Sequence, residues 1–459
     1  MKIKEILEIT KGTLLSGNES SECENFKIDS REIKKGDTFV SVAEGKINNI
    51  DYIKTAIKNG AKNCIIYNKE PIIKDETVNI IGVEDTQTAL QQMAEYERNR
   101  RNIPVVAITG SVGKTSTKDM VASVLSMKCK VLKTKGNMNN ELGLPLTILS
   151  LKDENLICVE MGMNHFGEIS RLTHIAKPTV AIITNVGTAH IGNLGSRENI
   201  LKAKLEILEG LQGNTIVINN DNDLLGEWAK SDKKYNKLTY GINNKSTFMA
   251  EDIQSYEDKS IYKLIEDKIV TEKGTQSTEG KNIEVTVPVG GEHFVLNSLC
   301  AIAVGTYFEI PKDKILQGIS KFELTKKRME LNTTKNGATV INDTYNANYD
   351  SMKAGITYLQ NIKDKRKIAI LGDMLELGDY AEELHSEVGK EIKDIDVLIT
   401  VGELSKNIAK NANAKEIYQY TSNADAITKA KEIITPNDII LVKASNSMKF
   451  IEIVEALIK

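Results

Sequence analysis

Residues 105–116 contain the side chains whose types and spacing point most directly to chemistry. The segment reads VVAITGSVGKTS, in which an apolar, β-branched run leads through two glycines to Lys-Thr-Ser. Gly110 and Gly113 allow backbone angles that larger residues resist, so successive amide N–H groups can point at a polyphosphate over the positive end of a following helix. Lys114 would reach the terminal phosphates, and the Thr115 hydroxyl would hold magnesium. The predicted nucleotide-binding residues of this loop are Gly110, Ser111, Gly113, Lys114, Thr115 and Ser116.

This segment departs from the standard phosphate loop in one respect. The standard loop has four residues between its glycines, whereas the earlier glycine position here is Ile108, which leaves Gly110-x-x-Gly113-Lys114-Thr115. Gly-Lys-Thr alone also fits an ordinary strand-to-helix turn with a surface lysine. The apolar run before the loop and the helically spaced apolar residues after it favour nucleotide binding.

Three further side chains could work beside this loop. Glu160 ends the apolar run 156–159, which we expect to lie beside the loop's strand, where a carboxylate could bind magnesium. His190 follows another expected strand, although a lone histidine is often only structural. Lys204 is expected to open the next helix, and its alternative is an ordinary surface lysine.

Amide side chains form a second group of candidates. Asn137, Asn139 and Asn140 lie in one short loop, which could be a simple turn or could hydrogen-bond a polar substrate. His293 and Asn297 are four residues apart and would share a helix face. Asn297 could read an adenine edge, while capping or surface roles remain open.

Polar residues also gather at 343–352, where a predicted strand turns into a helix. Asp343 and Asn346 could face a ligand across a cleft, whereas Asp350 or Ser351 could simply cap the helix.

The spacing of apolar residues predicts an α/β protein of three domains, because 459 residues exceed one ordinary core. Residues 1–84 form a small α/β unit, in which Ser30 and Arg31 could grip a phosphate or carboxylate or could form a solvated turn. A helix over 85–101 joins this unit to a central phosphate-loop domain, 85–320, with an expected parallel sheet. Residues 321–459 repeat the alternation as a Rossmann-like domain without GxGxxG. The charged stretch 246–280 is expected to form exposed strands and loops.

Composition excludes several classes of protein. A formal net charge of −3 argues against a nucleic-acid coat, and any anion site must therefore be local. The five cysteines are scattered without CxxC spacing, which is typical of reduced thiols in a cytoplasmic protein. We expect no signal peptide, no membrane span and a monomer.

Together these segments resemble the Mur ligases of peptidoglycan synthesis. The resemblance runs in order through TGSVGKTS, TKGNMNNELGLPLTIL, VEMGMNHFGEI, TNVGTAHIGNLGS with KAKLEIL, GEHFVLN, NDTYNANYDSM and LGDMLELG, and it covers essentially the whole chain. NDTYNANYDSM and LGDMLELG are most similar to the member that joins D-alanyl-D-alanine to UDP-N-acetylmuramoyl-tripeptide. The resemblance implies an ATP- and magnesium-dependent amide ligase that works through an acyl phosphate, with UDP-sugar, ATP and dipeptide domains in chain order.

The resemblance also implies roles for particular residues. Lys114 would contact phosphates, Thr115 and Glu160 would hold one magnesium, and His190 and a carbamylated Lys204 would hold a second. The remaining implied contacts are Asn297 to adenine, Arg328 and Asp343 to ribose or phosphates, Ser30, Arg31, Asn137, Asn139 and Asn140 to the UDP-sugar, and Tyr345, Asn346 and Asn348 to the dipeptide.

The chain departs from the family pattern at three places. Lys327 replaces the usual glycine before Arg328, Lys443-Ala444-Ser445-Asn446 lacks a final arginine, and the loop at 46–49 lacks the usual Asp-Gly-His character. The missing arginine leaves open the cation contact expected there and the dipeptide preference. Two alternatives also remain, a sister ligase that adds a single amino acid and a nucleotide-binding protein without catalysis. The third residue of the acceptor peptide, diaminopimelate or lysine, stays open.

Overall fold

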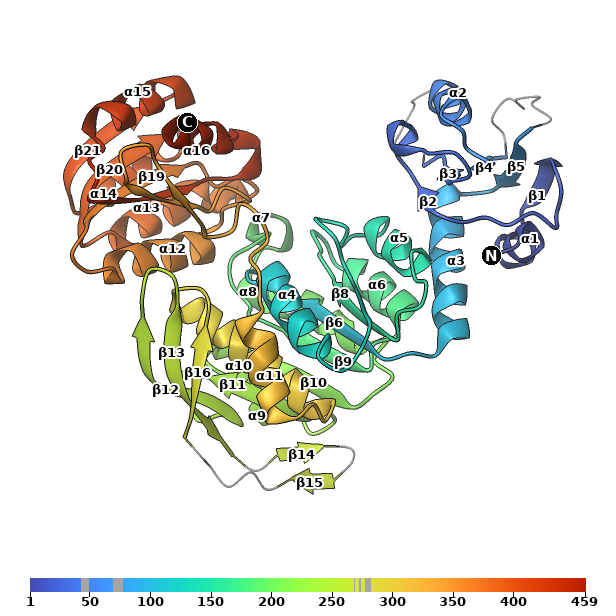
Figure 1. The fold of residues 1–459 in the computed structure, drawn as a ribbon, viewed down its shortest axis with the longest axis horizontal. Helices are drawn as coiled ribbons and strands as arrows, with labels where there is room; N and C mark the ends of the chain where they lie inside the picture. The colour runs from blue at the N-terminus through green and yellow to red at the C-terminus, as the bar shows by residue number, and fades with distance from the viewer. Residues whose placement is uncertain (43–48, 69–76, 268, 272–273, 277–281) are drawn as a thin grey trace.

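The computed structural model describes all residues except 43–48, 69–76, 268, 272–273 and 277–281. Part of the unusual 46–49 loop therefore lies outside the described residues. The chain forms three lobes, each built on its own sheet, and the first and third lobes stand at opposite ends of the central one (Figure 1). The mixed α/β fold predicted from the sequence is confirmed.

The N-terminal lobe is a five-stranded sheet in the order β1-β5-β4-β3-β2, in which only β1 is antiparallel to its neighbour. Its elements are α1 (Ile3–Thr10), β1 (Thr13–Ser16), β2 (Phe26–Lys27), β3 (Thr38–Val40), α2 (Ile50–Lys58), β4 (Asn63–Tyr67) and β5 (Asn79–Val83). Helix α3 (Thr86–Arg101) then leads into the central lobe, as the sequence predicted. Asp85 begins this helix by accepting a hydrogen bond from the Thr88 N–H, and buried Arg98 anchors its far end on the Ala176 carbonyl.

The central lobe contains a nine-stranded sheet in the order β16-β13-β12-β11-β10-β9-β6-β8-β7. Its strands are β6 (Val105–Thr109), β7 (Val131–Lys133), β8 (Leu156–Glu160), β9 (Val180–Ile183), β10 (Thr215–Asn219), β11 (Asn236–Gly241), β12 (Phe248–Ser255), β13 (Ser260–Glu266) and β16 (Ile283–Val287), while β14 (Ile269–Thr271) and β15 (Gly274–Gln276) form a separate ribbon. Strands β6, β8, β9 and β10 are buried along their whole length, as expected of parallel strands covered on both faces.

Helices cover this sheet on both faces. They are α4 (Lys114–Leu125), α5 (Gly143–Leu149), α6 (Glu168–Ala176), α7 (Ile191–Leu194), α8 (Arg197–Leu205), α9 (Asp223–Ser231), α10 (Glu292–Tyr307) and α11 (Lys312–Ser320). Helix α4 packs against α10 and α11 and is buried on nearly every side, so it is a core helix and not the one-sided amphipathic helix that its sequence suggested.

The C-terminal lobe has a six-stranded sheet, β17-β18-β22-β19-β20-β21, in which only β17 is antiparallel. Its elements are β17 (Glu330–Thr333), β18 (Thr339–Asn342), α12 (Tyr349–Asn361), β19 (Arg366–Gly372), α13 (Ala381–Glu391), β20 (Ile395–Val401), α14 (Lys406–Asn411), β21 (Ala414–Tyr420), α15 (Asn423–Ile433), β22 (Asp438–Lys443) and α16 (Ile451–Ile458).

One sequence-based expectation about elements was partly right and another was wrong. The stretch 246–280 contains strands as expected, but they are not simply exposed, because β12 and β13 join the central sheet and bury Phe248 and Tyr262 on the inward-facing side. Lys204 does not open a helix but lies next to the end of α8, which begins much earlier at a Ser196 cap.

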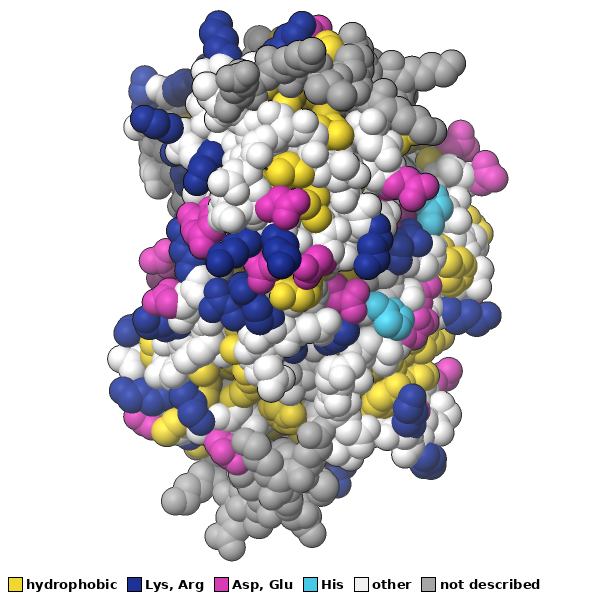
Figure 2. Space-filling model, turned by 90° about the vertical axis from the view of Figure 1, so that its right-hand side faces the viewer, with side chains coloured by type: hydrophobic (Ala, Val, Ile, Leu, Met, Phe, Trp, Pro, Cys, Tyr) yellow, Lys and Arg dark blue, Asp and Glu magenta, His cyan; other side chains and the backbone are white. Residues whose placement is uncertain are grey.

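The surface carries charges of both signs. On the face shown in Figure 2, basic side chains alternate with acidic ones across the middle of the molecule. Among the helices that the structure describes, none is both long and apolar enough to cross a bilayer.

Candidate active site

A cavity of about 420 Å³ lies between the central and C-terminal lobes. Its central-lobe walls are the 111–116 loop, the amide loop near 137–140 and the start of α10. The C-terminal lobe contributes Arg328 and Met329 directly before β17, the segments that follow β18 and β19, and Lys443 at the end of β22. The cavity therefore gathers the carboxyl ends of several strands, which is where ligands of open α/β sheets bind.

The predicted phosphate loop has the required backbone shape. A Cβ at Gly110 would stand 1.9 Å from Thr184 Oγ1, so the loop can pass the neighbouring strand only with glycine there. Lys114 Nζ donates to the Gly110 carbonyl at 2.7 Å and curls over the loop. Burial and the nearby Arg328 lower the pKa of Lys114, and the Glu160 carboxylate opposes them.

Asn185 fixes this loop and was missed by the sequence reasoning. Its Oδ1 accepts the N–H groups of Ser111 and Val112, both at 2.9 Å, and Thr184 Oγ1 donates to the Val112 carbonyl. An asparagine directly after the strand 180–184 was the available signal, because loop side chains at a strand end commonly satisfy backbone donors.

Thr115 and Glu160 meet as predicted. Strands β6 and β8 are parallel neighbours, and the Thr115 hydroxyl donates to Glu160 Oε2 at 2.9 Å. Asn139 Nδ2 donates to the other carboxylate oxygen at 2.8 Å, which ties the amide loop to the same point. Arg328 crosses from the C-terminal side and donates to Thr115 Oγ1 at 3.0 Å, with its guanidinium 3.9 Å from the Tyr345 ring centre.

His190 also lines the cavity, whereas Lys204 does not. Burial, together with the Lys114 and Lys204 charges, lowers the pKa of His190 to about 4, so its imidazole is neutral near pH 7. Its buried Nδ1 has no hydrogen-bond partner among the residues that the structure describes, and it stands 3.6 Å from Glu376 Oε2, too far for a hydrogen bond. Lys204 is 1% exposed and outside the cavity wall; burial and Lys114 lower its pKa well below the ordinary value, and Asp350 opposes them.

The C-terminal wall is organised by Lys443, which the sequence reasoning noted only within an altered motif. Lys443 is 2% exposed, and its Nζ donates to Asp343 Oδ2 at 2.5 Å and to the Asn346 carbonyl at 2.9 Å. Asn348 caps α12 because its Oδ1 accepts the Ser351 N–H at 2.9 Å, and the Asn348 N–H donates in turn to Ser351 Oγ at 3.1 Å. The N-cap is thus Asn348, and Ser351 takes part in capping as the partner residue of the capping box, whereas Asp350 does not cap this helix.

Asn297 lies on α10 one turn after His293, as expected. Its Oδ1 accepts a hydrogen bond from Thr117 Oγ1 at 2.8 Å, and its Nδ2 group is the side-chain donor that remains for a ligand. Burial lowers the pKa of His293 to about 4, so that the imidazole is neutral where it lines the cavity.

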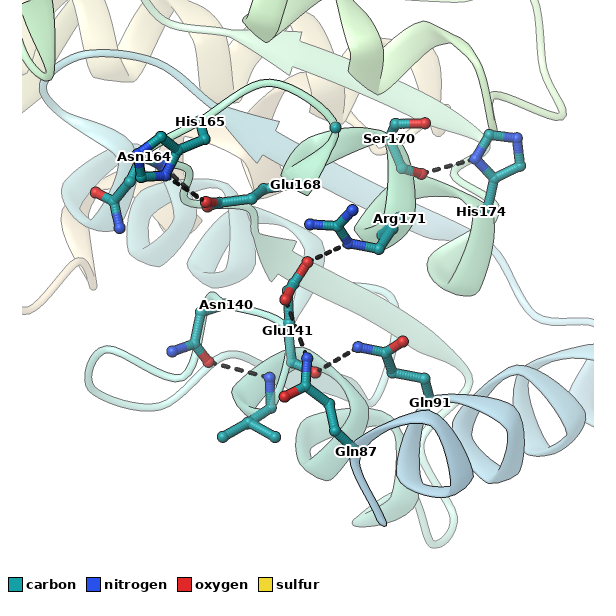
Figure 3. A network of polar contacts seen from close by, with 12 residues as sticks. Gln87, Gln91, Asn140, Glu141, Asn164, His165, Glu168, Ser170, Arg171 and His174 are labelled. Carbon is teal, nitrogen blue, oxygen red and sulfur yellow. Dashed lines mark hydrogen bonds and ion pairs between the residues drawn. The ribbon is translucent and has the colours of Figure 1, made fainter. Parts of the chain in front are cut away.

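The amide loop is held from outside by Glu141 (Figure 3). Gln87 of α3 donates to Glu141 Oε2 at 3.0 Å, and Arg171 of α6 donates to Oε1. Asn140 Oδ1 accepts the Gly143 N–H at 2.9 Å, which starts α5. The loop that carries Asn137, Asn139 and Asn140 is therefore fixed against the helix that leads to the N-terminal lobe.

Ser30 and Arg31 do not join the cavity. Ser30 is buried within the N-terminal lobe, and exposed Arg31 pairs with Asp29 at 2.6 Å. The other predicted site residues of the central and C-terminal lobes are brought together, except that Gly110 and Lys204 stand behind the cavity wall.

The donors around Thr115 suit magnesium. A hydroxyl and a carboxylate oxygen are hard ligands, and His190 offers an unpartnered neutral nitrogen. Within the described parts of the chain no group of three or more His, Cys, Asp and Glu side chains could hold a metal alone. Magnesium commonly completes its coordination with substrate phosphates and water, so this sparse protein set fits that ion.

The fold and the cavity define a nucleotide-binding ligase with three lobes. Residues 108–305 match the family described as Mur ligase middle domain, and residues 327–446 match Mur ligase, glutamate ligase domain. The chain belongs to the Mur ligase family, which confirms the resemblance found in its sequence.

Individual relatives narrow this class. The UDP-N-acetylmuramoyl-tripeptide--D-alanyl-D-alanine ligase of Bacillus subtilis (strain 168) is 36% identical over 467 residues, covering 100% of this chain and 98% of the relative. The ligase of the same name from Escherichia coli (strain K12) is 31% identical over 440 residues, covering 94% of this chain and 92% of the relative.

Solved structures agree with these relatives. MurF from Acinetobacter baumannii is 28% identical with a TM-score of 0.87, covering 100% of this chain and 98% of that one. MurF ligase from Thermotoga maritima in complex with ADP is 28% identical with a TM-score of 0.80, covering 95% of this chain and 97% of that one.

Proposed function

We propose that this protein joins D-alanyl-D-alanine to UDP-N-acetylmuramoyl-tripeptide, consuming ATP and forming UDP-N-acetylmuramoyl-pentapeptide, ADP and phosphate. The observation that carries the proposal is the cavity itself, in which the phosphate loop, the Thr115–Glu160 pair and Arg328 of the C-terminal side meet. Relatives of that name match over nearly the full length of both chains.

The chemistry explains why two lobes must share one site. A carboxylate does not condense with an amine unaided, so the γ-phosphoryl group of ATP is transferred to the terminal carboxylate of the tripeptide. The amine of the dipeptide then attacks the acyl phosphate carbonyl, and phosphate leaves. A site closed between lobes keeps out water that would hydrolyse this intermediate.

The positive charges of the site serve the phosphoryl transfer. Lys114 and Arg328 approach the same point from two lobes, where negative charge develops on the transferred group. Because Lys114 already curls over the loop, its ammonium is oriented before the nucleotide arrives. His293 and Asn297 would offer a neutral wall for the adenine ring, and we assign Arg328 and Asp343, which line the same cavity, to the ribose or phosphates.

Thr115 and Glu160 would hold one magnesium, and His190 and Lys204 as a carbamate would hold a second. When bound, the metal would neutralise charge between the phosphates. Burial lowers the pKa of the Lys204 amine well below its ordinary value, which favours the neutral form that adds carbon dioxide. The resulting carbamate would supply a carboxylate close to His190.

The substrates are assigned to the lobes in chain order. Residues 1–84, with Ser30 and Arg31, would bind the UDP-sugar, and the Asn137, Asn139 and Asn140 loop would receive the muramoyl peptide. The C-terminal lobe, 321–459, would bring the dipeptide past Tyr345, Asn346 and Asn348. We place the reaction in the cytoplasm and assign it to a monomer.

An amine screen tests this proposal. Purified protein with ATP, magnesium and UDP-N-acetylmuramoyl-tripeptide should release phosphate with D-alanyl-D-alanine and not with single amino acids. Release with a single amino acid would indicate a sister ligase. Bound ATP without substrate-dependent release would indicate a protein that binds nucleotide without catalysis.

A further inference from the structure

Asp350 of the C-terminal lobe contacts the loop of the central lobe that carries His190. Its Oδ2 accepts the Thr188 N–H at 2.8 Å and the Thr188 hydroxyl at 3.1 Å. Thr188 also begins the turn that places His190, because its carbonyl accepts the Ile191 N–H at 3.1 Å while His190 adopts φ 64°. One carboxylate thus holds the first residue of a turn whose third residue is in an uncommon backbone conformation.

The same loop is joined to the phosphate loop. The Gly187 N–H donates to Ser111 Oγ at 2.9 Å, and the Ser111 N–H donates to Asn185 Oδ1. A displacement of Thr188 would therefore be transmitted to two places, the His190 turn and the loop that receives the phosphates.

Asp350 is free to make this contact because Asn348 caps helix α12 in its place. Its charge lies in the first turn of that helix, where a carboxylate is favoured. A Cβ at Gly187 would stand 2.1 Å from Asp350 Oδ2, so the carboxylate fits only against a glycine.

A second contact between the lobes lies elsewhere and offers a matched comparison. Glu257, in the turn between β12 and β13, accepts Lys365 Nζ at 2.6 Å and Thr339 Oγ1 at 2.7 Å. This contact joins the same two lobes without touching the 184–191 loop.

We propose that Asp350 is a positioning residue, which couples docking of the C-terminal lobe to the placement of the His190 turn and the phosphate loop. Asp350 does not line the cavity, so it acts through Thr188 and not by touching substrate. The inference rests on the ligase activity proposed above.

Four variants test this role: Asp350→Ala, Asp350→Asn, Gly187→Ala and, as the control, Lys365→Met. Asp350→Ala removes two hydrogen bonds to a charged acceptor. Their loss should lower kcat by about tenfold to hundredfold. The KM for ATP should stay within about threefold. Asp350→Asn keeps an acceptor oxygen and should recover kcat to within about fivefold of the parent, while Lys365→Met should change it by less than about threefold.

The glycine provides a double-mutant cycle. Gly187→Ala should lower kcat about tenfold in the parent protein, because the added methyl displaces the carboxylate. In the Asp350→Ala background the same methyl meets no carboxylate, and its effect should fall below about twofold. The parent must first show dipeptide-dependent phosphate release, and its failure would count against the proposed function and not against Asp350.

Three results would overturn the inference in an active parent. They are an equal loss of kcat in Asp350→Ala and Lys365→Met, a rise in the KM for ATP at unchanged kcat, or a Gly187→Ala effect that persists without the carboxylate. If Asp350→Ala does not fold, the kcat values of Asp350→Asn and Gly187→Ala test the proposal instead. An unchanged kcat in a folded Gly187→Ala protein would contradict it.

Discussion

Asp119, on the phosphate-loop helix α4, should be a main support of the central lobe. Its carboxylate is 6% exposed and stands 2.7 Å from Lys133 Nζ and 3.2 Å from Lys118 Nζ. Its other oxygen accepts the hydroxyl of Thr325, which lies in the segment leading to Arg328. Asp119→Asn keeps the shape of the side chain, removes the charge and leaves the buried Lys118 ammonium without its carboxylate.

The loss of folding free energy in Asp119→Asn can be bounded from the contacts that Lys118 and Lys133 keep. Leaving one member of a buried ion pair unpaired costs about 3–5 kcal/mol. Lys118 keeps its bond to the Thr134 carbonyl at 2.8 Å, and Lys133 is 46% exposed and can rehydrate, so we expect about 2–4 kcal/mol. For a domain of this size that corresponds to a fall of about 4–16 °C in Tm.

Tryptophan fluorescence measures this change in one lobe. The chain has a single tryptophan, Trp228 in α9, so its signal reports the central lobe during thermal unfolding. Asp153→Asn is the matched control, since Asp153 pairs with Lys130 at 2.6 Å on the exposed surface and should leave Tm within about 1 °C. An equal shift in both variants would refute the reasoning. Lys118→Met should restore part of the loss in Asp119→Asn, because the unpaired charge is gone.

The pH dependence has a defined direction. Burial raises the pKa of Asp119, but Lys118, Lys133 and Thr325 outweigh burial and hold it below its ordinary value of 3.8. Since the folded pKa is lower than the unfolded one, the carboxylate's contribution is present above about pH 4 and is lost as pH falls through the folded pKa. The Tm difference between the parent and Asp119→Asn should therefore shrink below about pH 4.

Three other variants test the site. Lys114→Ala should abolish phosphate release while calorimetry finds binding of the UDP-substrate nearly unchanged, and weak UDP-substrate binding would contradict its assignment to ATP. Lys204→Ala should be inactive and partly rescued by formate if Lys204 acts as a carbamate, whereas no rescue over a full concentration series would count against that role. Glu257→Gln should loosen the contact with Lys365 and raise the radius of gyration in X-ray scattering without lowering the Tm seen by Trp228; an unchanged radius would exclude a role in holding the lobes together.

The local sequence pattern was enough to predict the phosphate loop and the position of the Glu160 carboxylate. Residues 105–116 show a buried strand, close glycines and a helix start, and these features depend on neighbours in the chain. Glu160 could be placed because the carboxyl ends of adjacent parallel strands meet at one edge of the sheet. The order of elements in the C-terminal domain followed from the same alternation.

Contacts between distant segments could not be predicted from pattern. Asp350 meets Thr188 across 162 residues, and Lys443 meets Asp343 across 100 residues. Neither pairing leaves a periodic signal, because each depends on how two lobes or two strands pack. The position of Lys204 was predicted wrongly for a local reason. The short helix α7 and the Ser196 cap start helix α8 before the charged residues that had suggested a helix start at Lys204.

The central claim is that one cavity couples ATP cleavage to amide formation. Its most direct test gives purified protein ATP labelled in the γ-phosphate, magnesium, UDP-N-acetylmuramoyl-tripeptide and D-alanyl-D-alanine, and follows ADP, phosphate and pentapeptide by mass spectrometry. The account predicts equal amounts of the three products over many turnovers, and without the dipeptide no pentapeptide and no more ADP than about one equivalent of the enzyme. Release of ADP with no pentapeptide, or no release at all, would contradict it.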